Sequence, residues 1–381
     1  MIFDVKLTEI QRHLAYLQTA CADCRFRAHP DAAERLRYFG DSITTLTQVA
    51  ATLERDLQLY QSASSPARDT WRQLFARLRD LANIVQTFRT VHLPAHLAST
   101  PQDHYMSSVF KQMHREVGLV DIYPVVSLHQ NVWFAVLGNI PRYPLYFAPA
   151  SLISDPAEYG LVYHEIGHTL FRLWDPAFAQ AVQAGILQAI QRKSREVYQG
   201  ISDPAVVKDR ATAFSEWQTQ TYYEMEETAC DAVGSLLGGP VFVTTLHMGL
   251  LLTADNPFMH GSLKYPPLDC RMRLSGIILR RLGLADQTLD PLNQGWARVQ
   301  TLYQAKKPRW YDWLYDDSYL DDIASAVEGH LRANSLHLYQ SAGGGLRQDL
   351  AEGASLLLGG ETPYGDWSAA FLQAIQRDYA P

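Results

Sequence analysis

Apolar residues recur at helical spacing through the first 92 residues of the chain. They form three stripes, separated by a break at His29-Pro30-Asp31 and a second break at residues 62–66. Side chains three and four positions apart share one face of a helix, so each stripe predicts an amphipathic helix. We therefore expect residues 1–100 to form an N-terminal bundle of three or four antiparallel helices. The stripes are Leu7, Ile10, Leu14 and Leu17, then Leu46, Val49, Leu53, Leu57 and Tyr60, then Trp71, Leu74, Leu78 and Leu81.

The period of the pattern changes after Asp121, where three short runs are rich in β-branched and aromatic residues. They span residues 122–128, 132–137 and 145–148, with turn residues between them. Such runs predict β-strands, here a small meander. The expected fold class is therefore mainly α with a small β-sheet, an α+β arrangement. The run at 145–148 is a candidate edge strand that would align an extended peptide by strand addition, and an ordinary covered strand is the alternative.

Helical periodicity returns near residue 154 and continues to the C-terminus. Long helices are expected at residues 176–195 and again from Ala211 onward, with a polar linker between them. We assign residues 101–285 to a second domain and residues 286–381 to a C-terminal helical region that packs on its core.

Composition and charge narrow the class of protein. Of the 381 residues 47% are hydrophobic, enough for a full globular core, and the net charge of −7 without a long basic run excludes nucleic acid as an expected partner. Residues 233–254 lack Asp, Glu, Lys and Arg, but Gly-Gly-Pro at 238–240 favours two short buried helices over a membrane span. With four cysteines and no signal-peptide pattern, we expect a reduced, cytoplasmic protein.

The pattern most specific for chemistry lies in the stretch from residue 154 to 174. Ser154 and Asp155 are cap candidates, Pro156 suits the first helical position, and the centre reads His164-Glu165-Ile166-Gly167-His168. Positions four apart share a helix face, so both imidazoles can bind one metal ion, usually zinc. Glu165 can then act as general base toward a water activated by the metal. The alternative is a helix with two hydrogen-bonded core histidines.

A third protein ligand is expected on the helix that includes residues 221–234. Glu227 is favoured because Asp231 lies one turn later on the same face and can accept an N–H of His164, which fixes the tautomer of that ligand. Tyr223, one turn before Glu227, can steady a developing oxyanion through its hydroxyl. The alternative for this helix is an acidic face exposed to solvent. The carboxylates compared are Glu224, Glu226 and Glu227.

The two motifs together resemble those of the gluzincins, and within them the group of the CAAX prenyl proteases and HtpX. The third-ligand motif of that group is a Glu followed four residues on by an Asp, here Glu227 and Asp231. The group also carries a His-Pro-Pro segment followed by an Arg, and Tyr265-Pro266-Pro267 precedes Arg271 in the same way, with tyrosine in place of the histidine. The resemblance covers residues 120–285. The membrane helices of the group are not evident in this sequence, so the chain resembles the soluble members of the group.

This resemblance implies a zinc-dependent endopeptidase. It places Zn²⁺ on His164, His168 and Glu227 and gives Glu165 the proton transfers, while the partner is a peptide or protein substrate. The N-terminal helices are a candidate surface for a further protein partner. The candidates for stabilising the oxyanion or binding substrate are Tyr223, His260, Tyr265 and Arg271.

Two alternatives are compatible with the same residues. The chain can be a zinc-binding regulatory or interaction protein that works through its N-terminal bundle, although a buried general base such as Glu165 has no use there. It can also be a peptidase autoinhibited by that bundle. Comparing cleavage by the full chain and by a truncation that starts near Asp103 would separate the second alternative from a constitutively active enzyme.

Overall fold

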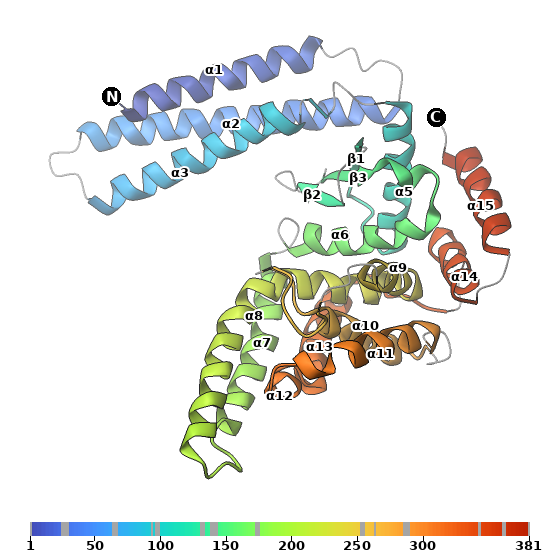
Figure 1. The fold of residues 1–381 in the computed structure, drawn as a ribbon. Coiled ribbons are helices and arrows are strands. Elements are labelled where there is room, and N and C mark those ends of the chain that lie inside the picture. The colour runs from blue at the N-terminus through green and yellow to red at the C-terminus, as the bar shows by residue number, and fades with distance from the viewer. Residues whose placement is uncertain are drawn as a thin grey trace. The chain divides into compact units, whose positions relative to one another are not determined.

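Helices dominate the computed structural model of the chain, and a small three-stranded sheet accompanies them (Figure 1). The predicted class, mainly α with a small sheet, is confirmed. The chain divides into two compact units, residues 1–104 and residues 105–380. The structure describes all residues except 1, 24–29, 63–67, 93, 96–99, 130–133, 138–143, 172–175, 252–255, 263, 285–289, 342–343, 360–362 and 380–381.

The first unit contains a bundle of long helices that run antiparallel in chain order (Figure 1). The predicted breaks are confirmed, since one helix begins at Pro30 and ends at Ser62. Most of the predicted stripes form the core, but Val49 and Trp71 are 38% and 37% exposed. The elements are α1 (Ile2–Asp23), α2 (Pro30–Ser62), α3 (Arg68–Thr87) and a π-helical turn (Phe88–His92).

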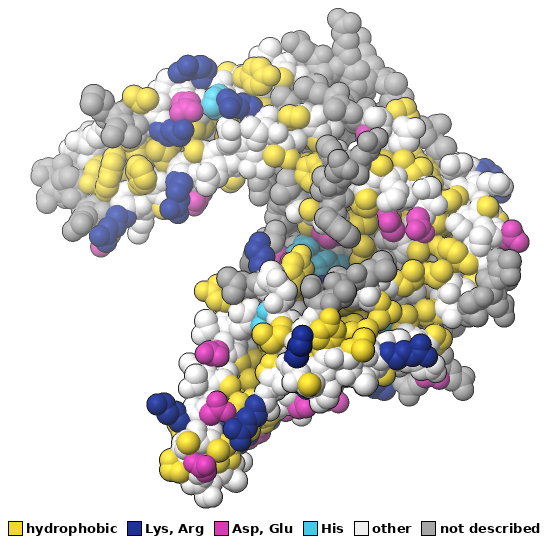
Figure 2. Space-filling view, in the orientation of Figure 1, with side chains coloured by type: hydrophobic (Ala, Val, Ile, Leu, Met, Phe, Trp, Pro, Cys, Tyr) yellow, Lys and Arg dark blue, Asp and Glu magenta, His cyan; other side chains and the backbone are white. Residues whose placement is uncertain are grey.

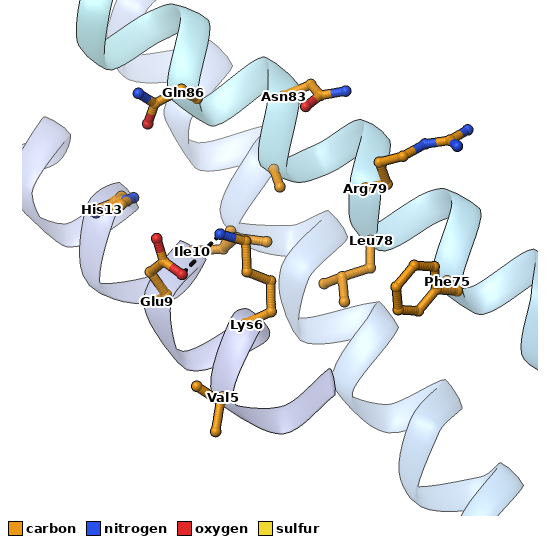
Figure 3. A pocket seen from close by; sticks show the side chains of 11 residues that line it. Val5, Lys6, Glu9, Ile10, His13, Phe75, Leu78, Arg79, Asn83 and Gln86 are labelled. Atoms are coloured by element: carbon orange, nitrogen blue, oxygen red, sulfur yellow. Dashed lines mark hydrogen bonds and ion pairs between the residues drawn. The ribbon is translucent and has the colours of Figure 1, made fainter. Parts of the chain in front are cut away.

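An apolar groove of about 770 Å³ lies between α1 and α3 (Figure 3). Val5 on α1 and Phe75 on α3 line it and are 65% and 48% exposed, and the ion pair between Lys6 and Glu9 lies at its edge with an N–O distance of 2.8 Å. Hydrophobic and charged side chains are interspersed on the face of the bundle drawn in Figure 2. The bundle thus buries most of its leucines, although Leu59 is 66% exposed, and the two charged groups of this ion pair lie at the surface.

The second unit holds the strands, the motif helix and the C-terminal helices. Within it α13 packs on α7 and α10, and α14 packs on α9, so the helices after residue 286 cover the same core. The elements are α5 (Pro101–Glu116), β1 (Val125–His129), β2 (Ala135–Leu137), β3 (Leu145–Pro149), the 3₁₀ segments η2 (Ala150–Ile153), η3 (Pro156–Gly160) and η6 (Gln304–Lys306), and the helices α6 (Leu161–Thr169), α7 (Pro176–Glu196), α8 (Pro204–Gly238), α9 (Pro240–Leu251), α10 (Leu268–Arg281), α11 (Asp290–Tyr303), α12 (Tyr311–Leu314), α13 (Asp317–Ala333), α14 (Leu346–Gly359) and α15 (Pro363–Tyr379).

The sheet is not the predicted meander. Its order is β1-β3-β2, with β3 parallel to β1 and antiparallel to β2. Of the two interpretations of residues 145–148, the edge strand is therefore wrong and the covered strand is confirmed, because β3 is the central strand. The reason lies in its side chains: Leu145, Tyr146 and Ala148 are all buried, and an apolar run with neighbours on both faces suits a central position.

The signals at the start of the motif helix work as predicted, with one difference in detail. The side chain of Asp155 accepts a hydrogen bond from the backbone N–H of Ala157 at 3.0 Å, and Pro156 is the first residue of the turn. That turn is 3₁₀, so the α-helical part begins only at Leu161. The cap and proline therefore fix where the chain enters the helix that carries the motif.

The helix expected from Ala211 begins earlier than predicted. It starts at Pro204, where Asp203 caps the backbone N–H of Ala205 at 2.8 Å, so the same Asp-Pro signal operates here. Its end is confirmed at the Gly-Gly-Pro break. At Gly239 φ is +57° and an added Cβ would lie 2.4 Å from the ring of Tyr339, so only glycine fits.

The break divides the uncharged stretch between the end of α8 and the start of α9. Only α9, with 12 residues, is the short helix that was predicted, because α8 is 35 residues long. Among the helices that the structure describes, none is both long and apolar enough to cross a membrane. Cys230 and Cys270 are buried free thiols, whereas Cys24 and the side chain of Cys21 lie outside the described residues.

Candidate metal centre

The motif helix α6 packs closely on the acidic part of α8. Gly167 permits this approach, because a Cβ atom at this position would lie 2.7 Å from the Cα atom of Cys230. A side chain there would push the two backbones apart. His164 and His168 are each 8% exposed and Glu227 is 6% exposed. The motif histidines and the candidate third ligand are therefore buried in the same helix contact.

Both imidazoles turn one nitrogen toward a single carboxylate oxygen. Glu227 Oε2 lies 3.2 Å from His164 Nε2 and 3.7 Å from His168 Nε2. Metal bonds of ~2.0–2.1 Å at tetrahedral angles put two ligand atoms roughly 3.4 Å apart. These separations fit a metal held by two histidines and one glutamate, which is the donor set of many catalytic zinc sites.

The other nitrogen of each imidazole contacts a different carboxylate. His164 Nδ1 donates to Asp231 Oδ1 at 3.0 Å, and His168 Nδ1 donates to Glu226 Oε1 at 2.8 Å. Protons held on both Nδ1 atoms leave both Nε2 lone pairs free for a metal. The structure thus brings Asp231 to His164 as expected. The sequence reasoning missed the matching role of Glu226, because it compared Glu226 only with neighbours on its own helix and not with the helix that faces it.

Arg271 holds the carboxylate behind His164. Its Nε and Nη2 atoms donate to the two oxygens of Asp231 at 2.6 and 2.8 Å, and Asp231 is fully buried. Burial alone would raise the pKa of Asp231, but the charge and hydrogen bonds of Arg271 lower it to about 2. Burial opposes the protonation of His164, but without a metal Asp231 and Glu227 raise its pKa to about 10, so its Nε2 then also carries a proton, which a bound metal would replace. Arg271 therefore holds the carboxylate that contacts the candidate ligand His164.

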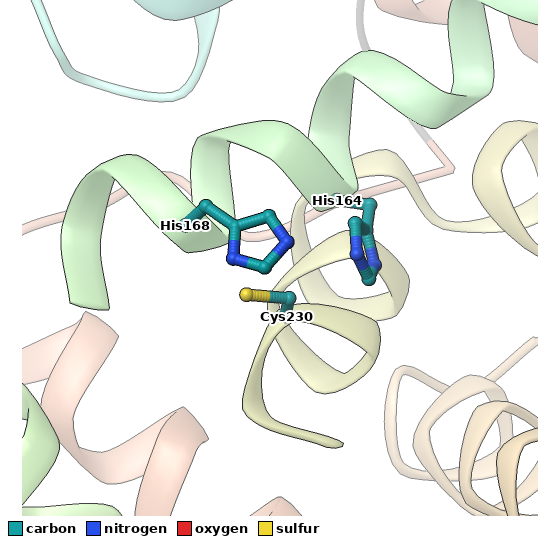
Figure 4. Close-up of side chains that lie close together, drawn as sticks. All are labelled: His164, His168 and Cys230. Atoms are coloured by element: carbon teal, nitrogen blue, oxygen red, sulfur yellow. The ribbon is translucent and has the colours of Figure 1, made fainter. Parts of the chain in front are cut away.

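A thiol lies in the same cluster. His164, His168 and Cys230 each offer a ligand atom within 4.8 Å of the others, and all three are buried. Figure 4 shows both imidazoles extending from α6 toward the turn of α8 that carries Cys230. Burial and the nearby carboxylates of Glu227 and Glu226 raise the pKa of this thiol well above its usual value, which disfavours the thiolate that a metal binds. Glu227 is the third ligand that the sequence reasoning predicted, and that reasoning did not consider Cys230 as one.

Three further predicted residues lie at different places around this cluster. Tyr265 is 41% exposed, its ring centre is 5.3 Å from the guanidinium carbon of Arg271, and burial together with the charge of Glu227 raises its pKa. His260 contacts other groups and not the candidate ligands. Tyr223 is 58% exposed, and within the described residues its hydroxyl has no polar partner. Of these three, Tyr265 is the one whose surroundings include the candidate metal ligands.

A buried hydrogen-bond chain supports the motif helix from the side of the sheet. His114 Nε2 lies 2.9 Å from the hydroxyl of Tyr146, which lies 2.9 Å from the hydroxyl of Thr169, and Thr169 donates to the backbone carbonyl of Glu165 at 3.2 Å. Burial lowers the pKa of His114 to about 4, so its ring is neutral near pH 7. This chain ties α5 and β3 to the turn of α6 that carries Glu165. Its members share no sequence spacing, so sequence analysis did not find it.

Comparisons of the chain with protein-family models, with characterised proteins and with solved structures give no match. The chemistry of the site is therefore argued from the geometry of its own residues.

Proposed function

We propose that the chain is a zinc-dependent endopeptidase with a zincin-like core of the gluzincin type, similar to soluble members of the CAAX prenyl protease and HtpX group. The observation that carries this proposal is the convergence of His164 Nε2 and His168 Nε2 on Glu227 Oε2, at 3.2 and 3.7 Å. A packing role gives no reason for two buried imidazoles to share one carboxylate oxygen while each Nδ1 is held separately.

The residues fit a divalent metal that keeps one coordination position open for water. His164, His168 and Glu227 would hold the ion, and Asp231 and Glu226 would keep both histidines in the tautomer that binds metal. When bound, Zn²⁺ supplies a Lewis acid that lowers the pKa of a water from ~15.7 to ~7.

Glu165 is the proton carrier of this mechanism. It follows His164 on α6, is 5% exposed, and its charge acts on both His164 and Tyr265. In this position it can take a proton from the attacking water and return it to the leaving amine. The buried chain that ends at the carbonyl of Glu165 fixes the backbone from which it acts.

An extended substrate would lie along the edge strand β2. The strand at 145–148, which was the candidate from the sequence, is the central one. β2 packs against α6 and pairs with β3 on one side, and its other edge has no neighbouring strand within the described residues. A peptide backbone can add to such an edge through main-chain hydrogen bonds, which orient it without reading its side chains.

Replacing Glu165 with glutamine tests the function directly. The substitution keeps the shape of the side chain and removes its basicity, so we expect metal content to stay at the wild-type value and hydrolysis of a proteome-derived peptide library to fall by ~10²–10⁴-fold. Glu158→Gln is the matched control, because Glu158 lies in the preceding turn and contacts Ser151. Unchanged turnover in Glu165→Gln would exclude the mechanism.

A further inference from the structure

Tyr265 lies in the segment before α10, next to the arginine behind the candidate metal centre. Its ring packs over the guanidinium of Arg271, which is bonded to Asp231 behind His164. The ring is 41% exposed, so a substrate can reach it. Burial and, after it, the charges of Glu227 and Glu165 raise the pKa of its hydroxyl. Tyr265 is therefore placed to donate a hydrogen bond beside the residues that would hold the metal.

His260, in contrast, has both ring nitrogens engaged with the protein. Nδ1 lies 2.6 Å from Glu224 Oε1 and 3.4 Å from the carbonyl oxygen of Tyr265, and Nε2 lies 3.2 Å from the hydroxyl of Tyr315. A histidine with both nitrogens engaged has no N–H left for a substrate oxygen. The role expected for His260 as an oxyanion donor is thus incompatible with these contacts.

The anchor of these contacts is a buried carboxylate on the ligand helix. Glu224 is 0% exposed and lies one turn before Glu227 on α8. A carboxylate in such a place is costly unless it has a charged or hydrogen-bonding partner, and His260 supplies one. Tyr315, which is 4% exposed and follows α12, holds the opposite side of the ring. One helix therefore carries both the candidate third ligand and the attachment point of the Tyr265 segment.

We infer that Glu224, His260 and Tyr315 form a clip that positions Tyr265 beside the His164–His168–Glu227 cluster, and that Tyr265 is the hydrogen-bond donor to the substrate carbonyl oxygen. The catalytic half of this inference rests on the proposed peptidase function. The clip itself is a statement about structure. Glu224, His260 and Tyr315 are positioning residues, and Tyr265 is the catalytic one.

A double-mutant cycle on the full chain tests the division of roles. Tyr265→Phe removes only the hydroxyl, so we expect kcat to fall by ~10²–10³-fold with KM and metal content near the wild-type values. His260→Ala displaces Tyr265 and should lower kcat by about 10–100-fold. In the Tyr265→Phe background, His260→Ala should cause no further loss, because it acts only through that hydroxyl. Multiplied losses, or full activity in Tyr265→Phe, would overturn the assignment.

A second readout needs no peptidase activity. Trypsin can cut after Lys264, next to Tyr265, and the clip should slow that cut in the wild type. We expect cleavage after Lys264, relative to cleavage elsewhere in the chain, to be several-fold faster in His260→Ala and in Tyr315→Phe. Tyr265→Phe and the control His337→Ala, at an exposed histidine outside the segment, should match the wild type.

The two readouts separate the two ideas. If the wild type hydrolyses no peptide, the proposed function fails, and the trypsin rates still decide whether the clip exists. If the wild type is an active peptidase but Lys264 is cut equally fast in wild type, His260→Ala and Tyr315→Phe, the clip is wrong and the function stands. Tyr315→Phe removes one hydroxyl from a buried ring, so it remains informative if His260→Ala does not fold.

Discussion

The two units of the chain treat charged side chains in opposite ways. In the described part of the first unit, Asp103 is the only charged side chain that is buried, and ion pairs such as Lys6–Glu9 and Arg77–Asp56 lie at the surface. In the second unit, histidines, carboxylates and an arginine are buried together where α6, α8 and α10 meet. The bundle shows that long helices of this chain can pack on apolar residues alone.

Burial of charge is therefore informative here, but it is not sufficient by itself. Lys193 is fully buried in the second unit, where Asp316 lies 2.8 Å away and the rings of Trp217 and Trp313 surround it. That arrangement compensates one charge with one partner and leaves no group free to act. What distinguishes the centre between α6 and α8 is that several ligand-type atoms converge on one point. The comparison of Lys193 with this centre shows that burial of a charge does not distinguish a candidate site, whereas the convergence of ligand-type atoms does.

Removal of the third ligand should have the largest effect. We expect Glu227→Ala to lose bound zinc, because two imidazoles alone hold the ion weakly, and Glu226→Gln to weaken binding by only ~10–100-fold. Elemental analysis of the purified chains after dialysis against a chelator measures both. Glu9→Ala in the bundle is the control and should keep full metal content. Retention of zinc in Glu227→Ala with its loss in Cys230→Ala would instead make the thiol the ligand.

The sequence could predict those features of the centre that are set within a single helix. The spacing of His164 and His168 and that of Glu227 and Asp231 are helix-face relations, and the cap at Asp155 is a local signal. Each strand also lies at its predicted run, because the runs follow from local composition, but β1 and β2 begin three residues later than predicted.

The rest depends on which elements face each other, and no local pattern encodes that. Glu226 contacts His168 across the helix contact, Glu224 contacts His260 from a segment beyond α9, and His114 reaches the motif helix through β3. The order of the strands was wrong for the same reason: pairing of β1 with β3 is a long-range choice made by burial of β3 on both faces.

Replacing one arginine in each unit with alanine tests whether a buried ion pair and a surface ion pair contribute differently to stability. Arg271→Ala leaves Asp231 buried without its partner, so we expect the free energy of unfolding of the second unit to fall by ~3–5 kcal/mol. Arg77→Ala removes a surface partner of Asp56 and should cost less than ~1 kcal/mol. Hydrogen exchange of α8 and of α2 under increasing urea reports each unit separately. Equal losses of the free energy of unfolding in the two variants would show that the buried and the surface ion pair contribute equally to stability.

The same pair has a pH signature. The folded-state pKa of Asp231, about 2, lies below its ordinary value of 3.8, so its contribution to stability is present above about pH 4 and is lost as the pH falls toward 2. Without Arg271 the main cause of the low pKa is absent. The metal-free Arg271→Ala chain should therefore lose the stability of its second unit at a higher pH than the wild type, while the acid response of α2 stays the same.

A smaller effect is expected from one added methyl group in each unit. Gly167→Ala places a Cβ atom 2.7 Å from the backbone of Cys230, and the resulting separation of α6 and α8 should cost ~1–3 kcal/mol in the second unit and weaken metal binding. Gly40→Ala meets nothing within 4 Å in α2 and should stabilise the bundle by up to ~1 kcal/mol. Because the obstacle at residue 167 is a backbone atom, the double variant Gly167→Ala with Cys230→Ala should not recover stability. Recovery would mean that the thiol, and not the closeness of the two helices, sets the requirement for glycine in the motif.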